Sequence, residues 1–79
     1  MQTNTELLSR IVVNEKILTG KPIVRGFRIS VEQILKALAS GNSEKEILQN
    51  FPELESDDIR ACLLYAANIL EDEKIYKVA

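Results

Sequence analysis

The chain has 79 residues, of which 46% are hydrophobic, and its formal net charge is −2. This length allows one domain, and the apolar fraction excludes an intrinsically disordered chain. The single cysteine excludes an internal disulfide, and the lack of histidine removes the commonest acid–base group and metal ligand.

The two ends of the chain are expected to flank one small domain. Residues 1–9 predict a polar lead-in, frayed or loosely helical, residues 10–72 the domain, and residues 73–79 a short tail. No apolar signal-peptide run opens the chain and no stretch reaches the ~20 apolar residues of a membrane span, so we expect a soluble cytoplasmic protein. A domain this small buries only about 60% of its unfolded surface and is marginally stable alone. We therefore expect it to be stabilised as a homodimer.

Charge is unevenly distributed along the chain. Residues 10–36 carry six cations and two acids, a balance of +4, whereas residues 37–79 carry four cations and nine acids, a balance of −5. Such an asymmetry indicates two partner surfaces of opposite character. Small soluble domains also segregate charge by chance, and the sequence alone leaves both interpretations open.

A small β-ribbon is expected first in the domain. Its elements are a strand over residues 10–13, a turn over residues 14–18, and two short strands over residues 23–24 and 27–29. The chain reverses at Arg25-Gly26, because glycine tolerates a positive φ there. Arg25 and Arg28 are then expected to project from the ribbon.

Three amphipathic helices are expected after the ribbon, over about residues 31–40, 44–51 and 57–71. Each begins after a serine N-cap: Ser30, Ser43 and Ser56. Gln33 and Glu46 stand three residues after the first two caps and complete capping boxes. Gly41 ends the first helix and Pro52 ends the second.

The inward stripes of these helices predict the core residues, which are Leu35, Leu38, Leu48, Leu54, Ile59 and Leu63. The third helix carries more apolar surface than one small core requires, with Leu64 and Tyr65 on a second face. We expect these two residues to form a dimer contact. The alternative is that Tyr65 covers the core of the monomer.

Catalysis is poorly supported by the sequence. Cys62 lies on the apolar face of the third helix with no base nearby, and is expected to be a buried, inert thiol. Asp57 and Asp58 stand in the first turn of that helix, where solvated carboxylates interact favourably with the helix dipole. Residues 20–22 lack the spacing of a phosphate-binding loop. The sequence therefore favours a binding protein over an enzyme.

The second and third helices, a short one and a longer one joined by a tight turn, follow the pattern of a helix-turn-helix. The third helix is a poor recognition helix, because its first turn is acidic and Arg60 is its only cation before Lys74. The candidate residues for binding nucleic acid or a partner are Lys21, Arg25, Gly26, Phe27, Arg28 and Arg60. Arg25 and Arg28 contact phosphates in this interpretation; in the alternative, they pair with acids such as Glu32.

Several motifs occur in a fixed order along about residues 10–70: Gly20-Lys21-Pro22-Ile23-Val24-Arg25-Gly26, Arg28-Ile29-Ser30-Val31, Gly41, Glu46-Ile47-Leu48, Phe51-Pro52-x-Leu54, Asp58-Ile59-Arg60-Ala61 and Tyr65-Ala66. In these motifs the chain resembles the bacterial domain of unknown function family 433. The resemblance implies a homeodomain-like trihelical fold after a small β element. It also implies an antitoxin that is paired with a PIN-like nuclease toxin and regulates itself by binding DNA. The family usually has Thr at the position of Phe27, and an exposed Phe there favours apolar docking over a hydroxyl–phosphate contact.

The sequence thus predicts a mainly α fold, a three-helix homeodomain-like helix-turn-helix domain preceded by a small N-terminal β-ribbon. The function that we expect is that of an antitoxin-like regulatory protein, which is dimeric, neutralises a PIN-like nuclease and binds DNA weakly. The alternative is a protein–protein adaptor or scaffold domain with no DNA role. No catalytic residue, metal, cofactor, membrane contact or small-molecule substrate is expected.

Overall fold

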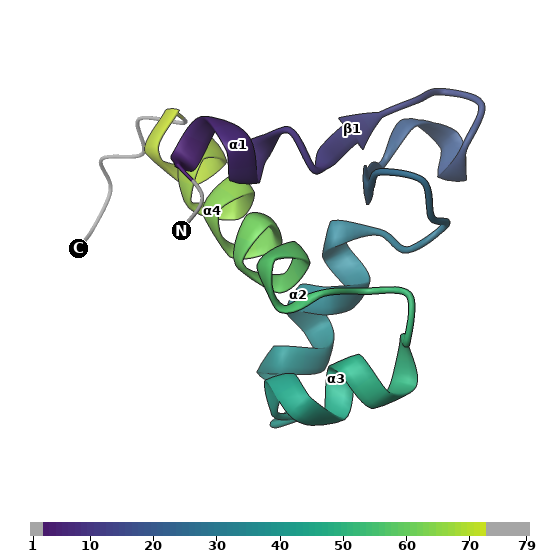
Figure 1. Cartoon of the computed structure of the whole chain (residues 1–79). Helices are drawn as coiled ribbons and strands as arrows, with labels where there is room; N and C mark the ends of the chain where they lie inside the picture. The colour runs from purple at the N-terminus through teal and green to yellow at the C-terminus, as the bar shows by residue number, and fades with distance from the viewer. Residues whose placement is uncertain (1–2, 73–79) are drawn as a thin grey trace.

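A computed structural model of the chain describes residues 3–72 (Figure 1). Its elements in chain order are α1 (Asn4–Leu8), β1 (Ile11–Val13), the 3₁₀ helix η1 (Leu18–Gly20), β2 (Pro22–Val24), α2 (Val31–Ala39), α3 (Glu44–Asn50) and α4 (Ser56–Asp72). The described residues are mainly helical, with one small two-stranded antiparallel sheet, as the sequence predicts at this coarse level. The predicted tail over residues 73–79 lies outside the described residues.

The first helix, α1, forms where the sequence predicts a frayed or loosely helical lead-in. Thr3 and Glu6 make a capping box, in which the side chain of each accepts the backbone N–H of the other. Leu7 is buried, and α1 packs against α4. This helix is therefore held by a tertiary contact with the last helix of the fold, which local sequence patterns do not reveal.

The sheet is formed by β1 and β2, with Ile11 opposite Val24. The backbone N–H of Arg25 extends the pairing by donating to the carbonyl oxygen of Arg10 at 2.7 Å. The strand expected over residues 10–13 is therefore confirmed to within one residue. Its partner is β2, so the sheet joins segments on either side of the η1 loop.

The turn at Gly26 is confirmed. Gly26 has φ +82°, and the N–H of Phe27 donates to the carbonyl oxygen of Val24 at 3.0 Å. The strand expected over residues 27–29 is wrong, because the chain after the turn leaves the sheet almost at once to begin α2. What remains of that pairing is an isolated antiparallel bridge between Ile23 and Ser30, with a bond of 2.9 Å from the Val24 N–H to the Ile29 carbonyl oxygen.

The capping boxes at Ser30 and Ser43 are both confirmed, so α2 and α3 begin where the sequence predicts. The N-cap predicted at Ser56 is wrong: Ser56 is already helical, and its hydroxyl donates to a Glu44 carboxylate oxygen at 2.7 Å. The backbone N–H of Glu55 instead donates to Asp58 Oδ2 at 2.7 Å. At α4, Asp58 therefore takes the place that Gln33 and Glu46 have at the two earlier helices, where their side chains accept the backbone N–H of the serine N-cap.

The buried core contains Val24, Ile29, Val31, Ile34, Ile47, Leu54, Ile59 and Cys62. The predictions for Leu54 and Ile59 are confirmed. Leu35, Leu38 and Leu48 are only partly buried and cover the rim of the core. The prediction that Leu63 belongs to the core is wrong, since Leu63 is 48% exposed. In α2 and α3 the isoleucine beside the predicted leucine turns inward, which corresponds to a rotation of each helix by one residue.

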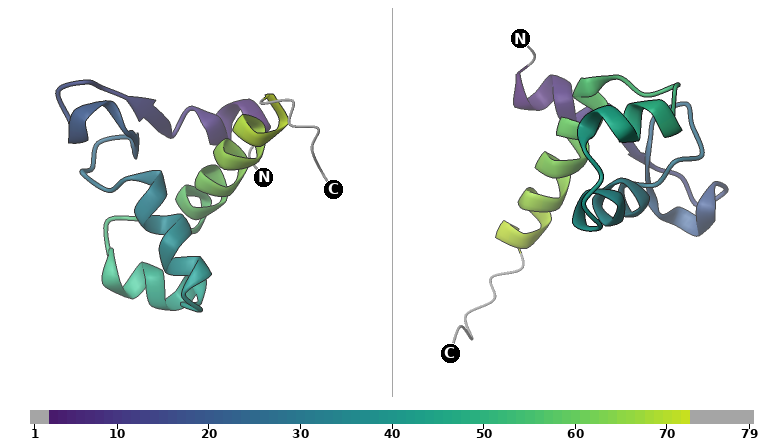
Figure 2. Two further views of the ribbon diagram at one scale, coloured as in Figure 1. Left: turned by 180° about the vertical axis from the view of Figure 1, so that it is seen from behind. Right: turned by 90° about the horizontal axis from the view of Figure 1, so that it is seen from below.

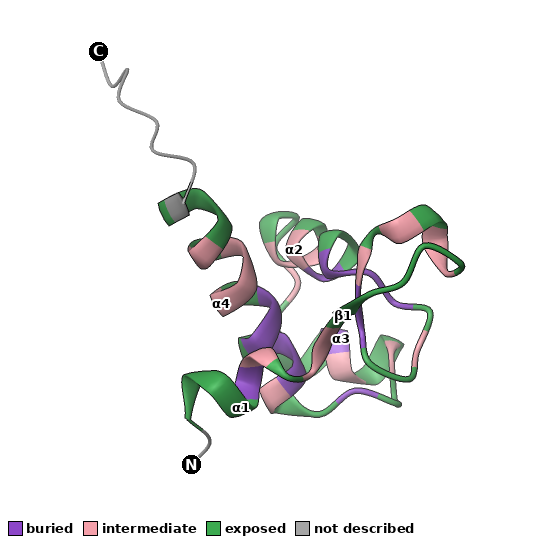
Figure 3. Ribbon diagram, turned by 90° about the horizontal axis from the view of Figure 1, so that it is seen from above, coloured by how far each residue is buried: buried purple, intermediate pink, exposed green. Residues whose placement is uncertain are grey.

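The helices do not cover α4 evenly. Buried residues gather in its N-terminal half (Figure 3), and its C-terminal half extends away from the other helices (Figure 2). Ile69 and Leu70 in this half are 41% and 65% exposed. Across residues 3–72, no helix is both long enough and apolar enough to cross a membrane.

Candidate functional site

The most exposed basic feature is the turn at Gly26, which carries Arg25 and Arg28 on either side. Both arginine side chains are exposed, and neither forms an ion pair with any described residue. Their pairing with Glu32, the alternative expected from the sequence, does not occur, because the Glu32 carboxylate is occupied by two lysines. The structure thus leaves the charge of this turn available to a ligand.

Phe27 lies between the two arginines and packs, partly buried, against the hydrophobic core. The expectation of an exposed Phe for apolar docking is therefore wrong. Its ring anchors the turn to the domain and leaves the flanking arginines in solvent. At Gly26, where φ is positive, a Cβ would meet no atom within 4 Å, so the tip of the turn stands in free space.

Acidic side chains lie on one flank of this turn. Arg25 and Phe27 share a small concave surface with Glu53, Glu55, Asp58 and Arg10, and Arg10 binds Glu55 and Asp58. Since acids near a phosphate-binding group oppose nucleic-acid binding, this flank lowers the attraction of Arg25 for a polyanion. On the opposite flank, where Arg28 lies, the charged lining residues are three cations, Lys21, Arg28 and Lys36, and one acid, Glu32.

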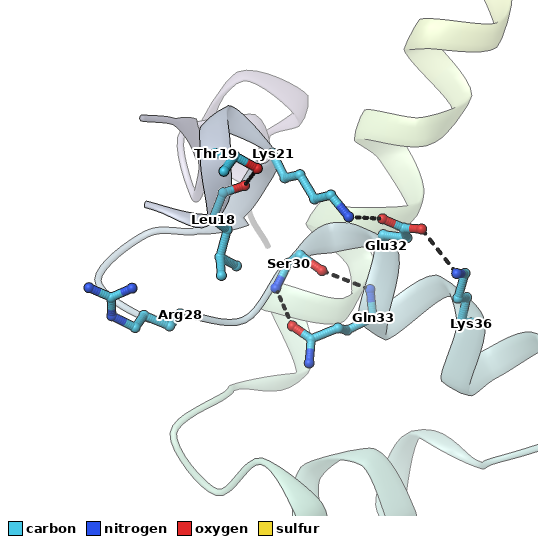
Figure 4. A pocket seen from close by; sticks show the side chains of 8 residues that line it. All are labelled: Leu18, Thr19, Lys21, Arg28, Ser30, Glu32, Gln33 and Lys36. Carbon is cyan, nitrogen blue, oxygen red and sulfur yellow. Dashed lines mark hydrogen bonds and ion pairs between the residues drawn. The ribbon is translucent and has the colours of Figure 1, made fainter. Parts of the chain in front are cut away.

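On that opposite flank an open pocket of about 610 Å³ is formed by η1, the segment after the turn and the start of α2 (Figure 4). Glu32 occupies its edge and binds Lys21 Nζ at 3.1 Å and Lys36 Nζ at 3.0 Å. These contacts, Lys36 first, lower the pKa of Glu32 below its ordinary value. Lys21, a predicted site residue, therefore lies in a charge cluster beside Arg28.

Arg60 does not join the basic turn. Its guanidinium binds Asp57 Oδ1 at 3.2 Å, one helical turn earlier on α4. It lines a shallow hollow together with Leu7 and Leu64, next to α1. Of the six predicted binding residues, Arg60 is therefore the one that the structure places elsewhere.

A buried ion pair that the sequence did not reveal joins Arg10 to α4. Arg10 Nη1 lies 2.9 Å from Asp58 Oδ1 and 2.9 Å from Glu55 Oε1. The hydrogen bonds to Glu55 and then to Asp58 raise the pKa of Arg10. Asp58 is only 5% exposed, so the expectation of a solvated carboxylate at this position is wrong. The partners are 48 residues apart, and no local motif indicates their contact.

Cys62 is buried, as expected, with its side chain in the core. Burial, assisted by the charge of Asp58, raises the pKa of Cys62 to about 12. A thiol with this pKa is almost entirely protonated at neutral pH and is a poor nucleophile. Within residues 3–72, no group of three or more His, Cys, Asp or Glu side chains is placed to hold a metal ion.

The two residues predicted for a dimer contact are less exposed than their neighbours. Tyr65 packs against the core and Leu64 is partly buried. The more exposed apolar residues of α4 are Leu63, Ile69 and Leu70. A contact between two copies through α4 would therefore centre on these residues, with Leu64 and Tyr65 at its side.

These features describe a small, mainly α domain that presents arginines on a glycine turn. Residues 11–66 match the family described as "Protein of unknown function (DUF433)", so the chain belongs to this family, as its motifs indicate. It is 38% identical over 50 residues to "Uncharacterized protein y4eO" of Sinorhizobium fredii (strain NBRC 101917 / NGR234), a match that covers 63% of this chain and 23% of that relative. The match thus spans less than a quarter of the relative's length. No solved structure matches the chain.

Proposed function

We propose that the protein is an antitoxin-like regulatory protein of a bacterial toxin–antitoxin pair. In this proposal it is a homodimer in the cytoplasm, binds DNA weakly and neutralises a PIN-like nuclease. The helices α2, α3 and α4 are its homeodomain-like trihelical unit, with the helix-turn-helix formed by α3 and α4. The antitoxin role and the nuclease partner follow from the family resemblance, and the DNA contact follows from the site.

The observation that carries the DNA contact is the exposed, unpaired state of Arg25 and Arg28 within the described residues. Of the other cations between residues 10 and 36, Arg10, Lys21 and Lys36 are bound to carboxylates, whereas Lys16 forms no ion pair with a described residue. Arginines on a projecting turn contact phosphates without reading bases, so the expected binding tolerates many sequences. The acids beside Arg25 account for the weakness that we propose.

The helix-turn-helix contributes little direct contact in this proposal. Asp57 and Glu55 stand at the start of α4, and Arg60 is paired with Asp57. A recognition helix with such an N-terminus would bring carboxylates to the phosphates. The turn at Gly26 therefore supplies the principal contact, and a dimer presents it twice.

A titration of duplex DNA at low salt tests the DNA contact. The wild-type protein should bind, and the Arg25→Ala/Arg28→Ala variant should bind every duplex sequence more weakly by a similar factor. The matched control is Lys16→Ala/Lys45→Ala, which removes the same charge from two exposed lysines that form no ion pair among the described residues. If the two double variants weaken binding equally, the net charge of the protein alone explains the effect. This result would contradict the assignment of the DNA contact to Arg25 and Arg28.

The nuclease contact is tested separately. A PIN-like nuclease encoded in the neighbouring reading frame should lose its RNA-cleaving activity when this protein is added in equimolar amount. The lack of such a gene beside this one, or unchanged cleavage in the mixture, would contradict the antitoxin role.

A protein–protein adaptor with no DNA role is the second candidate, and the exposed apolar half of α4 favours it. Leu63 and Leu70 are seven residues apart and share one face of the helix. Binding through this face would depend on apolar burial and would be comparatively insensitive to salt. Lack of DNA binding by the wild-type protein at low salt would leave this candidate in place of the DNA role.

A further inference from the structure

The open pocket beside the Gly26 turn gathers three cations around one carboxylate. Lys21, Arg28 and Lys36 line the pocket, and Glu32 is its one acid. Figure 4 shows the Arg28 side chain extending to one side, away from the cluster of Lys21, Glu32 and Lys36. The cations of the pocket therefore lie in two places: Lys21 and Lys36 on either side of Glu32, and Arg28 apart from them (Figure 4).

The ion pairs of Glu32 are exposed to solvent. The side chains of Lys21, Glu32 and Lys36 are 56%, 48% and 76% exposed, and the contacts are 3.1 and 3.0 Å long. Exposed pairs of this kind contribute little to stability, because water solvates the separated charges almost as well. A nucleic-acid phosphate carries one negative charge, as Glu32 does, so a phosphate that enters the pocket can compete with Glu32 for the two lysines.

We propose that this pocket is a seat for a nucleic-acid phosphate, and that Glu32 limits its affinity. In the bound state Lys21 and Lys36 contact one phosphate, and Arg28 contacts a neighbouring phosphate of the same backbone. Cations at two separate places along one pocket (Figure 4) suit a polymer with successive charges better than a single small anion. This inference rests on the proposed DNA contact and extends it from the turn to the start of α2.

Because Glu32 competes with the phosphate in this proposal, its replacement should strengthen DNA binding, not weaken it. Glu32→Gln removes a negative charge from the pocket and frees both lysines, so it should tighten duplex binding at low salt by roughly 3- to 10-fold. The control is Glu71→Gln, the same chemical change at an exposed position of α4. Lys21→Ala/Lys36→Ala should weaken binding and lower the dependence on salt, relative to Lys16→Ala/Lys45→Ala. All affected side chains are exposed, so the melting temperatures should stay close to that of the wild type.

The outcomes separate the pocket from the arginine turn. If Arg25→Ala/Arg28→Ala weakens binding while Glu32→Gln and Lys21→Ala/Lys36→Ala bind as the wild type does, the pocket proposal is overturned and the turn remains. If neither the wild type nor Glu32→Gln binds duplex DNA, both proposals fail.

Inorganic phosphate distinguishes a nucleic acid from a free anion. We expect the amide resonances of Glu32 and Gln33 to shift on titration with duplex DNA, and to need a far higher concentration of inorganic phosphate for the same shift. Saturation by phosphate at the concentration that suffices for DNA phosphate groups would assign the pocket to a small anion and overturn the nucleic-acid assignment.

Discussion

The buried carboxylate of Asp58 holds together two distant parts of the chain. It binds the guanidinium of Arg10 at 2.9 Å and accepts the backbone N–H of Glu55 at 2.7 Å. Asp58→Ala removes a buried partner of Arg10 and a cap of α4, while the exposed Glu55 still offers a partial counter-charge. We expect a loss of about 2–4 kcal/mol in the free energy of unfolding, measured by urea denaturation.

Asp57 is the natural control for this change, because it stands one residue earlier in the same helical turn. Its ion pair with Arg60 lies at the surface, so Asp57→Ala should cost less than about 1 kcal/mol. Similar losses for the two variants would mean that the position in the helix, and not the buried pair, determines the stability.

At the scale of single residues, the burial of a side chain could be predicted at some positions and not at others. Cys62 was expected to be buried because it stands on an apolar stripe, and it is. Asp58 was expected to be a solvated carboxylate in the first turn of a helix. Its burial could not be predicted, because its partner Arg10 is 48 residues away in the sequence. Phe27 stands where the family usually has Thr, and an exposed Phe there would favour apolar docking, yet its ring packs, partly buried, against the core.

The turn between β2 and α2 depends on the conformation of Gly26. At φ +82° a residue with a Cβ is strained even though the space around it is open. Gly26→Val should therefore disturb the backbone of residues 23–29 while α2, α3 and α4 remain formed, at a cost of roughly 1–3 kcal/mol.

Gly26→Asn is the comparison for this variant, because Asn adopts a positive φ more readily than a β-branched residue. We expect near-native amide shifts with Asn and large changes with Val in the turn, with helical circular dichroism retained in both. Native amide shifts over residues 23–29 in Gly26→Val would show that the turn does not require glycine.

Helices α2 and α3 bury isoleucine where the sequence favoured leucine. Ile47 is fully buried, whereas Leu63 of α4 is 48% exposed. Ile47→Ala should destabilise the domain by about 2–5 kcal/mol, because it removes buried apolar volume. Leu63→Ala should change the stability by less than about 1 kcal/mol when measured below the concentration of any self-association. The reverse order of the two effects would contradict the burial of Ile47 and the exposure of Leu63.

At the scale of elements, the capping boxes could be predicted from local signals, whereas the N-cap at Ser56, the strand over residues 27–29 and the contacts between distant elements could not. The Ser30 and Ser43 capping boxes involve residues three apart, so the starts of α2 and α3 could be predicted directly. The pairing of β1 with β2 closes across the η1 loop, and α1 is held by α4. These contacts depend on the tertiary fold, for which a single sequence carries no local pattern.

At the scale of the whole molecule, the exposed apolar end of α4 predicts self-association. Leu63, Ile69 and Leu70 leave apolar surface that the described residues do not cover. Sedimentation at about 50 μM protein, a concentration suited to weak association, should give a dimer. Leu70→Glu should shift it toward the monomer, and Gln49→Glu, the same added charge on α3, should not. A monomeric wild type would contradict the dimer.

Only part of the candidate site could be predicted from the sequence, because some of its residues come together only in the folded domain. Arg25, Gly26 and Arg28 were found because the turn is local, and the charge excess of residues 10–36 pointed to them. Lys36 is missing from the predicted site, although the i,i+4 spacing of Glu32 and Lys36 is a local signal for their ion pair. The contact of Lys21 with the same carboxylate forms only when the segment after η1 lies beside the start of α2. Arg60 was assigned to the site from its charge alone, and the fold places it next to α1.

The proposed DNA role depends on Arg25 and Arg28 binding phosphates. Its most direct test is the salt dependence of duplex binding, measured for the wild type and for Arg25→Ala/Arg28→Ala between low and moderate salt. Each phosphate contact that is lost should lower the slope of log affinity against log salt concentration by about 0.9, so the loss of both contacts should lower it by about 1.8 for each protomer that touches the duplex. Identical slopes for the two proteins, or no binding by the wild type at low salt, would contradict this role.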